Sequence, residues 1–404
     1  MLETETGQNS ADVRREHSYE KMLDTFVKDV YLGVYLRPWR GKRLDSAYLA
    51  REVRDISKVQ NLPAEKVWDD LHVKIEHARS SLAGWLRFIP LAFYYVTRAV
   101  KFWITWQAYA RLWSSRYVRE LDDDWFGEES WQKKPTVESP LASVVVLSFN
   151  RLAYLKTTLH SLFQTLEPNE VELIVVDNGS TDGSAEFVCE LAERGAIDKA
   201  ILCSRNLGSS KGFNLGFAHA NPSSKYLTKF DGDIVALTPG WLRRFDRFLT
   251  TQRDVGVVAM TQVNHFVLTC PPRKTLAGEE VSSWNWGVCG GSGMTMSREV
   301  FSRFGYFRED FDFPYMPLDK DSSLRLALLG YENYYLQECE SYHRADLDHS
   351  LYKKEQSRKG SQSRQRWHAK EQLVRGYATG ELSPTVFYPH YASCQSNDRI
   401  IEIA

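Results

Sequence analysis

From Ser143 onward, the chain alternates between short apolar runs and segments with helical periodicity. The runs S-V-V-V-L-S-F and V-E-L-I-V-V-D are rich in β-branched residues, as expected for strands that are covered on both faces. Residues 152–166 have a helical pattern between these two runs. The runs K-A-I-L-C-S and K-Y-L-T-K-F-D predict a third and a fourth strand. Successive strand–helix units predict an α/β domain with a doubly wound, mostly parallel sheet flanked by helices.

The two ends of the chain differ in texture from this central part. Residues 1–135 predict helices, with a charged amphipathic part followed by an aromatic-basic stretch, and Pro135 and Pro140 mark a boundary. Residues 346–404 are polar and basic at first and then partly helical, which is typical of a surface extension. Contact of these basic residues with anionic lipid or a phosphate-bearing acceptor is the alternative. The sequence therefore divides into a helical N-terminal region, a domain at residues 141–345 and a C-terminal extension.

Polar clusters follow the predicted strands at the point where each strand ends. They are Ser148–Arg151, Asp177–Asp182, Asn206–Asn214 and Asp231–Asp233. Ligands of such sheets bind beyond the carboxyl ends of the strands, so the four clusters are expected to line one site. The last cluster is D-G-D, in which two carboxylates one residue apart can face the same side. Such a pair suits Mg²⁺ or Mn²⁺, and such an ion suits a diphosphate, although D-G-D is also an ordinary turn that ends a strand.

Composition narrows the class of protein. The 404 residues carry a formal net charge of -1, with 43% hydrophobic and 25% charged residues, so nothing global points to nucleic acid as a partner. Six cysteines without a C-x-x-C pair predict reduced, mostly buried thiols. The polar, acidic start M-L-E-T-E-T-G-Q-N-S is unlike a cleavable signal peptide. These features predict a cytoplasmic protein.

A stretch rich in aromatic and basic residues lies at residues 84–113. Arg87, Arg98, Lys101 and Arg111 interrupt its apolar runs, which argues against a membrane-spanning helix. Basic residues interleaved with Trp, Tyr and Phe suit a helix in the plane of a membrane interface, which would make the protein peripheral on the inner face of the cell membrane. The alternative is a helix packed against its own domain, with its arginines reaching to solvent.

The order of these clusters resembles glycosyltransferase family 2, the inverting nucleotide-sugar enzymes of GT-A fold. S-V-V-V-L-S-F-N-R resembles the opening strand and turn of the family, I-V-V-D-N-G-S-T-D its nucleotide-base motif, and D-G-D its metal-binding D-x-D. G-G-S-G-M-T-M-S-R-E-V-F resembles the acceptor-side segment, and L-D-K-D-S-S-L-R-L the E-D-x-D-x-x-x-R motif. The resemblance implies a GT-A domain at residues 141–345 that moves a sugar from a nucleoside diphosphate sugar, most commonly a UDP-sugar. Family habit implies a cell-envelope, capsular or lipid-linked glycan as acceptor, as in polysaccharide biosynthesis.

The resemblance also implies roles for individual residues. Asp319 is the general base that takes the acceptor's proton. Asp231, Asp233 and His343 hold Mn²⁺ or Mg²⁺, although a lone histidine is more often structural. Leu318 stands where the family usually has Glu, which leaves the positioning of the acceptor open. The donor-binding set is Ser148, Asn150, Arg151, Asp177, Asn178, Asp182, Asn206, Lys211 and Asp231.

Several residues have a structural alternative. Arg325 follows Asp321 by one helical turn, and we expect an ordinary helix ion pair from these two. Lys211 stands just before a predicted helix start, where its ammonium and the backbone amides could hold a diphosphate. The alternative is a flexible lysine that caps nothing. Trp284 and Trp286 suit an apolar wall against a sugar ring, or the core.

Two other classes of protein compete with this interpretation. A GT-A-fold protein that binds or scaffolds in a glycan-assembly complex without turnover is favoured by Leu318 and opposed by Asp231, Asp233 and Asp319. An unrelated nucleotidyltransferase or dehydrogenase is disfavoured, because the first strand is followed by no G-x-G-x-x-G and the sequence has no P-loop. We therefore expect a metal-dependent, inverting glycosyltransferase.

Overall fold

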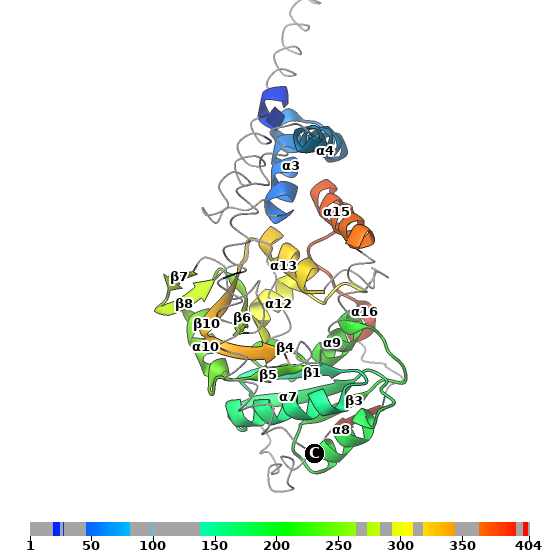
Figure 1. Ribbon diagram of the computed structural model, residues 1–404, viewed down its shortest axis with the longest axis vertical. Coiled ribbons are helices and arrows are strands. Elements are labelled where there is room, and N and C mark those ends of the chain that lie inside the picture. Colours follow the sequence, from blue (N-terminus) through cyan, green and yellow to red (C-terminus); the bar gives the residue numbers. More distant parts are fainter. Residues whose placement is uncertain are drawn as a thin grey trace, which may run out of the picture. The chain divides into compact units, whose positions relative to one another are not determined.

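The computed structural model of the protein describes several stretches of the chain, which are residues 19–24, 27, 46–80, 100, 138–263, 273–282, 293–309, 318–343, 363–392 and 399–402. The chain divides into two compact units. The first comprises Met1–Trp103 and Trp367–Ser383, and the second comprises Ile104–Arg366 and Pro384–Ala404. Figure 1 shows the elements coloured from blue to red along the sequence.

The first unit is helical. Its elements are α3 (Ser46–Gln60), α4 (Ala64–Ser80) and most of α15 (Ser363–Thr379). His72 Nδ1 of α4 lies 3.1 Å from Glu371 Oε1 of α15. Arg54 of α3 donates a hydrogen bond to the carbonyl oxygen of Tyr377. Helices that are far apart in the sequence therefore pack into one unit.

The second unit is an α/β domain built on one mixed sheet. Its strands are β1 (Ala142–Ser148), β2 (Val171–Asp177), β3 (Lys199–Leu202), β4 (Tyr226–Asp231), β5 (Ile234–Ala236), β6 (Val255–Gln262), β7 (Arg273–Leu276), β8 (Glu279–Ser282), β9 (Met294–Ser297), β10 (Glu332–His343) and β11 (Arg399–Glu402). They lie in the order β11-β3-β2-β1-β4-β9-β6-β10-β8-β7, and β5 pairs with β10. The four strands predicted from the sequence, now β1 to β4, form a parallel core. The antiparallel strands β9 and β11 border this core on its two sides.

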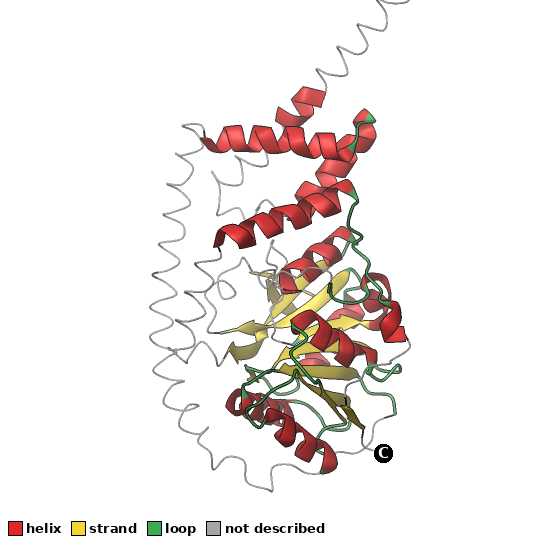
Figure 2. Cartoon of the chain, turned by 90° about the vertical axis from the view of Figure 1, so that its right-hand side faces the viewer, coloured by secondary structure: helices red, strands yellow, loops and turns green. Residues whose placement is uncertain are grey.

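Helices cover both faces of the sheet (Figure 2). They are α7 (Leu152–Thr165), α8 (Ser184–Glu193), α9 (Ser209–Ala218), α10 (Trp241–Thr251), α12 (Arg298–Phe304) and α13 (Leu318–Leu328), with a short α16 (Pro389–Ala392). Val144 and Val146 of β1 pack in one buried cluster with α7, α8 and α10. Val145 packs in a second cluster with α9, α12 and α13, because successive strand residues point to opposite faces. The predicted strands covered on both faces are therefore confirmed.

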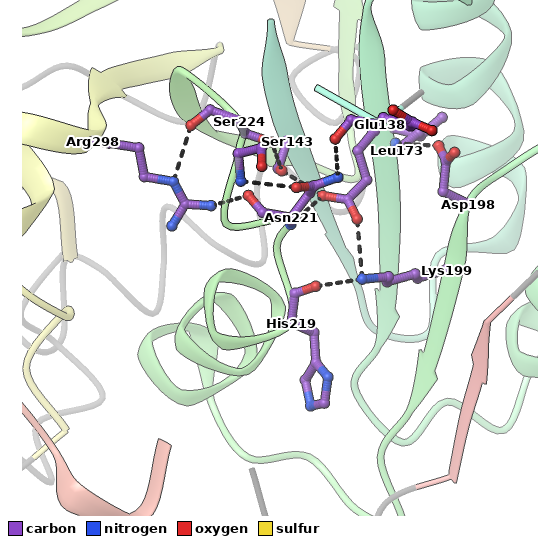
Figure 3. Close-up of polar contacts among 11 residues, drawn as sticks. Glu138, Ser143, Leu173, Asp198, Lys199, His219, Asn221, Ser224 and Arg298 are labelled. Atoms are coloured by element: carbon purple, nitrogen blue, oxygen red, sulfur yellow. Dashed lines mark hydrogen bonds and ion pairs between the residues drawn. The ribbon is translucent and has the colours of Figure 1, made fainter. Parts of the chain in front are cut away.

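A buried polar cluster joins the amino ends of β1, β2 and β3. Glu172 is 6% exposed, and its Oε1 lies 3.1 Å from Lys199 Nζ. Its Oε2 accepts hydrogen bonds from Ser143 Oγ and from the backbone N–H of Asn221. Figure 3 shows that Lys199 also donates to the carbonyl oxygen of His219, at 2.7 Å. The charge of Glu172 is therefore compensated at the edge of the sheet that is opposite the predicted site.

Replacement of Glu172 by Ala is expected to lower the free energy of unfolding by about 3 kcal/mol, because Lys199 would lose its carboxylate partner in a mostly buried position. Urea denaturation followed by circular dichroism measures this loss. Glu190→Ala is the matched control, since Glu190 pairs with Arg194 on the exposed surface of α8. It should cost less than about 1 kcal/mol. Equal losses in the two variants would contradict the structural role of the Glu172 cluster.

Two further predictions concern the membrane and the cysteines. Among the described helices, none combines the length and the apolar character that crossing a bilayer requires. Apart from residue 100, the aromatic-basic stretch at 84–113 lies outside the described residues, and its membrane contact stays a prediction.

Cys203 and Cys339 are buried and Cys189 is half-buried. No disulfide joins cysteines within the described stretches.

Candidate functional site

The carboxyl ends of three neighbouring strands bring the predicted donor-side residues to one edge of the sheet. In the parallel register, Ser148 at the end of β1 lies opposite Asp177 at the end of β2. On the other side of β1, Leu147 lies opposite Asp231 at the end of β4. Polar clusters that are separate in the sequence are therefore adjacent in the fold, because parallel strands end at the same edge.

Ser148 and Asp177 each carry a buried polar atom that has no protein partner in the described part of the chain. Asp177 Oδ1 accepts hydrogen bonds from the N–H groups of Gly179, at 3.2 Å, and Ser180, at 2.9 Å. Asp177 Oδ2 and Ser148 Oγ are buried without a hydrogen bond to the described residues. Such an atom costs about 1–3 kcal/mol if it stays unpaired. A ligand that offers an N–H group to Asp177 would remove this cost.

Asn178 and Asn206 build the loop that leads into α9. Asn178 Nδ2 donates to Asn206 Oδ1 at 3.1 Å and to the carbonyl oxygen of Gly208 at 3.2 Å. Asn178 Oδ1 accepts the N–H of Leu207 at 2.9 Å. Lys211 is exposed in the first turn of α9, and we find no ion pair of its ammonium with the described residues. The two asparagines thus present the start of α9 to the site, and the donor contacts of all three residues stay predictions.

Asn150 and Asp182 join the turns after β1 and β2. Asn150 Oδ1 accepts the N–H of Thr181 at 2.7 Å. Asp182 Oδ2 accepts the N–H of Leu152 at 2.8 Å, and its Oδ1 accepts the N–H of Ser184 at 3.1 Å. Burial raises the pKa of Asp182, but these hydrogen bonds outweigh burial and lower the pKa. Asp182 therefore accepts hydrogen bonds from the first residues of α7 and α8. Its direct contact with a donor stays a prediction.

The middle residue of D-G-D has to be small. The N–H of Gly232 donates to the carbonyl oxygen of Leu147 at 3.0 Å. A Cβ atom at Gly232 would lie 2.7 Å from the same oxygen, which is too close for any other residue type. The turn is therefore packed tightly against the end of β1, and this packing fixes the positions of Asp231 and Asp233.

Asp233 is the inner carboxylate of the pair, with 8% of its side chain exposed. Its Oδ2 forms an ion pair with Arg151, and contact of Arg151 with a phosphate stays a prediction. The pairing of β5 with β10 places His343 opposite Ile234, and His343 Nε2 lies 3.7 Å from Asp233 Oδ1. The structure therefore brings together Asp233 and His343, two of the three predicted metal ligands.

A divalent cation fits this pair of donors. Nε2 and Oδ1 lie 3.7 Å apart, which two ligands at about 2.1 Å from one ion can span, and a closer approach to about 3.0 Å would give neighbouring octahedral positions. Asp231 is engaged elsewhere, since its Oδ1 lies 2.8 Å from Lys229 Nζ. Among the described residues, no group of three or more His, Cys, Asp or Glu side chains is arranged as a metal site. Asp233 and His343 are therefore the closest of the predicted ligands, and the binding of a cation by Asp231, Asp233 and His343 stays a prediction.

Lys229 connects the donor side to the predicted base, and sequence reasoning missed it. Its side chain is 3% exposed, and its Nζ lies 2.8 Å from Asp231 Oδ1 and 3.3 Å from Asp319 Oδ1. Asp319 stands at the second position of α13, with 21% of its side chain exposed. A signal was present in K-F-D, because a residue two positions before Asp231 in a strand faces the same side.

Burial and neighbouring charges shift the pKa values of Lys229 and Asp319. Burial lowers the pKa of Lys229, but Asp231 and Asp319 outweigh burial and raise the pKa above its ordinary value. Lys229 therefore stays charged inside the protein. Burial raises the pKa of Asp319, and Asp231 raises it further, while Lys229 acts in the opposite direction; the net shift is upward. A raised pKa suits a carboxylate that has to take a proton.

The rest of α13 is structural. The predicted ion pair is present, with Arg325 Nη1 at 3.5 Å from Asp321 Oδ2, and both side chains are buried. Arg325 also donates to the carbonyl oxygens of Phe304, Tyr306 and Pro384. Arg325 thus holds the segment after α12 and the C-terminal segment against the helix that carries Asp319. Trp284 and Trp286, and Gly290-Gly291 after them, lie outside the described residues.

The matches to known proteins lie in the parallel core of the sheet and in the segment that follows it. Residues 143–305 match the family described as glycosyl transferase family 2. An uncharacterized glycosyltransferase of Haemophilus influenzae is 30% identical over 121 residues, which are 30% of this chain and 36% of that protein. One of Nostoc sp. is 29% identical over 116 residues, which are 29% of this chain and 35% of that protein. The chain thus spans about a third of the length of the curated relatives it matches.

Solved structures show a weaker similarity to this chain. The mannosyltransferase PcManGT from Pyrobaculum calidifontis, in complex with GDP-Man and Mn²⁺, has a TM-score of 0.41 and 17% identity over 62% of this chain and 68% of that chain. S. aureus TarS 1–349 has a TM-score of 0.40 and 18% identity over 51% and 60% of the two chains. The predicted resemblance to this family is confirmed over residues 143–305, and the predicted α/β fold is confirmed by the sheet described above. The chain is therefore similar, in residues 143–305, to glycosyl transferase family 2.

Proposed function

We propose that this chain is an inverting glycosyltransferase that moves a sugar from a nucleoside diphosphate sugar to an acceptor hydroxyl. The observation that supports it most is the position of Asp319. The family match ends before Asp319, yet its carboxylate shares the ammonium of Lys229 with Asp231, the last residue of β4. A base beside the donor edge is what direct displacement at an anomeric carbon requires.

The nucleotide base binds at the ends of β1 and β2. Asp177 Oδ2 is a buried acceptor, and an ionised carboxylate can only accept hydrogen bonds. Uracil and thymine offer a ring N–H at N3, and guanine offers one at N1. We favour a UDP-sugar as donor, and thymidine and guanosine diphosphate sugars fit the same hydrogen bond.

In the transfer step, Asp319 takes the proton of the acceptor hydroxyl as the acceptor oxygen bonds to the anomeric carbon. The bond from that carbon to the diphosphate oxygen breaks on the opposite face, and the nucleoside diphosphate leaves with the electron pair. The configuration at the anomeric carbon is inverted. Asp233 and His343 would hold Mn²⁺ or Mg²⁺, which supplies Lewis-acid stabilisation of the leaving diphosphate.

The acceptor is a glycan or a lipid-linked glycan of the cell envelope. This part of the proposal rests on the habit of the family and on the aromatic-basic stretch at residues 84–113, which would keep the enzyme at the inner face of the membrane.

A thermal-shift screen of nucleoside diphosphate sugars, with and without Mn²⁺, tests the donor site. A bound donor raises the melting temperature by mass action. Asp177→Asn is expected to weaken donor binding about 10- to 100-fold, because the amide presents N–H groups to the donor's N–H. The variant can keep the oxygen that holds Gly179 and Ser180, so the free protein should melt near the wild-type temperature.

Asp198→Asn is the matched control for Asp177→Asn. Asp198 accepts the N–H of Leu173 far from the strand ends that form the site. Donor binding should be unchanged in this control. Equal donor binding by Asp177→Asn and the wild type would contradict the assignment of Asp177 to the site of the nucleotide base.

One observation favours a second candidate function, a GT-A-fold protein that binds donor without turnover. Leu318 stands directly before Asp319, where the family usually has Glu. Donor binding in the screen without any donor hydrolysis or transfer would support this second candidate.

A further inference from the structure

Lys229 is a buried cation that contacts a carboxylate from each side of the candidate site. Asp231 belongs to β4 and Asp319 to α13, and these elements are far apart in the sequence. Both carboxylates lie within 3.3 Å of one Nζ atom. We propose that Lys229 is a positioning residue, which holds the general base at a fixed distance from the donor edge. The proposal rests on the proposed function.

The ammonium of Lys229 is fixed from a second direction. Its Nζ lies 4.7 Å from the centre of the Phe213 ring, in the geometry of a cation–π contact. Phe213 belongs to α9 and packs against Phe307, with 6.3 Å between the ring centres. Both phenylalanines are about 1% exposed. The position of the ammonium is therefore set by the core and not by solvent.

Exposure separates the roles of Lys229 and Asp319. Lys229 is 3% exposed, too little for contact with a sugar or a diphosphate. Asp319 Oδ1, which faces Lys229, is buried, while 21% of the whole side chain is exposed, so we assign the contact with an acceptor hydroxyl to Oδ2. Lys229 therefore acts on the reaction through Asp319.

The contact has a consequence for the rate. Without the ammonium, Asp231 and Asp319 would repel each other, and the Asp319 carboxylate would lose the partner that fixes its side-chain orientation. A base displaced by about 1 Å can cost on the order of 100-fold in rate. The contacts given above for Ser148 and Asp177 do not involve Lys229, so we expect donor binding there to change little.

The test is the acceptor-independent hydrolysis of the donor sugar, measured in a double-mutant cycle. Lys229→Met is expected to lower kcat about 10- to 100-fold while KM for the donor changes less than about threefold. Beside Asp319→Asn, the same replacement should lower kcat no further, because it acts through Asp319. Lys225→Met is the matched control: it removes an exposed pair with Asp246 and should keep the wild-type kcat.

Lys229→Arg repeats the cycle with a variant that keeps a buried cation, in case Lys229→Met does not fold. A smaller fall in kcat that also disappears beside Asp319→Asn supports the proposal. An unchanged kcat in the variants that fold, or a fall that persists beside Asp319→Asn, overturns it. Absence of turnover by the wild-type chain with every donor would instead remove the proposed function, and this inference with it.

Discussion

Replacement of Asp319 by Asn is expected to lower kcat for donor hydrolysis and for sugar transfer about 10²- to 10⁴-fold. An amide has nearly the size of a carboxylate but cannot take the proton of the acceptor or of water. The Lys229–Asp231 contact remains available in the variant, so KM for the donor should stay near the wild-type value. Nucleotide release with and without an acceptor measures both constants.

The pH profile gives an independent check on Asp319. Burial and the nearby Asp231 raise its pKa, and Lys229 only partly offsets them. A base works in its deprotonated form, so the rate should increase as the pH rises through the pKa of Asp319. The acid limb should lie above the ordinary aspartate value of about 3.9. Asp319→Asn should remove this limb from the residual rate.

Asp254→Asn is the control for Asp319→Asn, since Asp254 is exposed in the turn before β6. Its kcat should equal that of the wild type. A wild-type kcat in Asp319→Asn would refute the assignment of Asp319 as the general base. The donor site would then have no assigned base.

Replacement of Asp233 by Ala is expected to abolish the metal-dependent part of donor binding. Asp233 directs Oδ1 towards His343 and pairs with Arg151 through Oδ2, so the variant loses a cation ligand and releases a guanidinium. The stabilisation of the wild type by donor and Mn²⁺ should reach about 2.7 kcal/mol at a donor concentration of 100 times Kd. The measurement is the melting temperature with donor, in Mn²⁺ and in EDTA.

His343→Ala separates the two functions of Asp233. It removes the imidazole ligand and keeps the Arg151–Asp233 pair, so it should weaken the Mn²⁺ effect without abolishing donor binding in EDTA. Asp254→Ala should behave as the wild type in both buffers. If Asp233→Ala retains the full Mn²⁺-dependent shift, the proposed cation site is wrong.

Much of the donor edge could be predicted from residue order. The mostly apolar runs predicted β1 to β4 to within two residues, because a strand buried on both faces has a largely apolar sequence. The polar residues after each run had to meet at one edge, because the strands are parallel. Glu172 shows the limit of this reasoning. A charge inside a buried strand is tolerated here because Lys199 of β3 meets it, and that pairing depends on the register between strands.

The sequence by itself determined the parallel core, the polar strand ends and the resemblance to a family of sugar-transferring enzymes, since these follow from local periodicity and the order of motifs. Tertiary structure alone decided which charges from different elements pair with one another. Arg151 pairs with Asp233, and Lys229 of β4 reaches Asp319 of α13, although nothing in the spacing of these residues specifies either contact. The physical reason is that a buried charge takes its partner from whichever elements pack around it, and packing brings together residues that are remote along the chain.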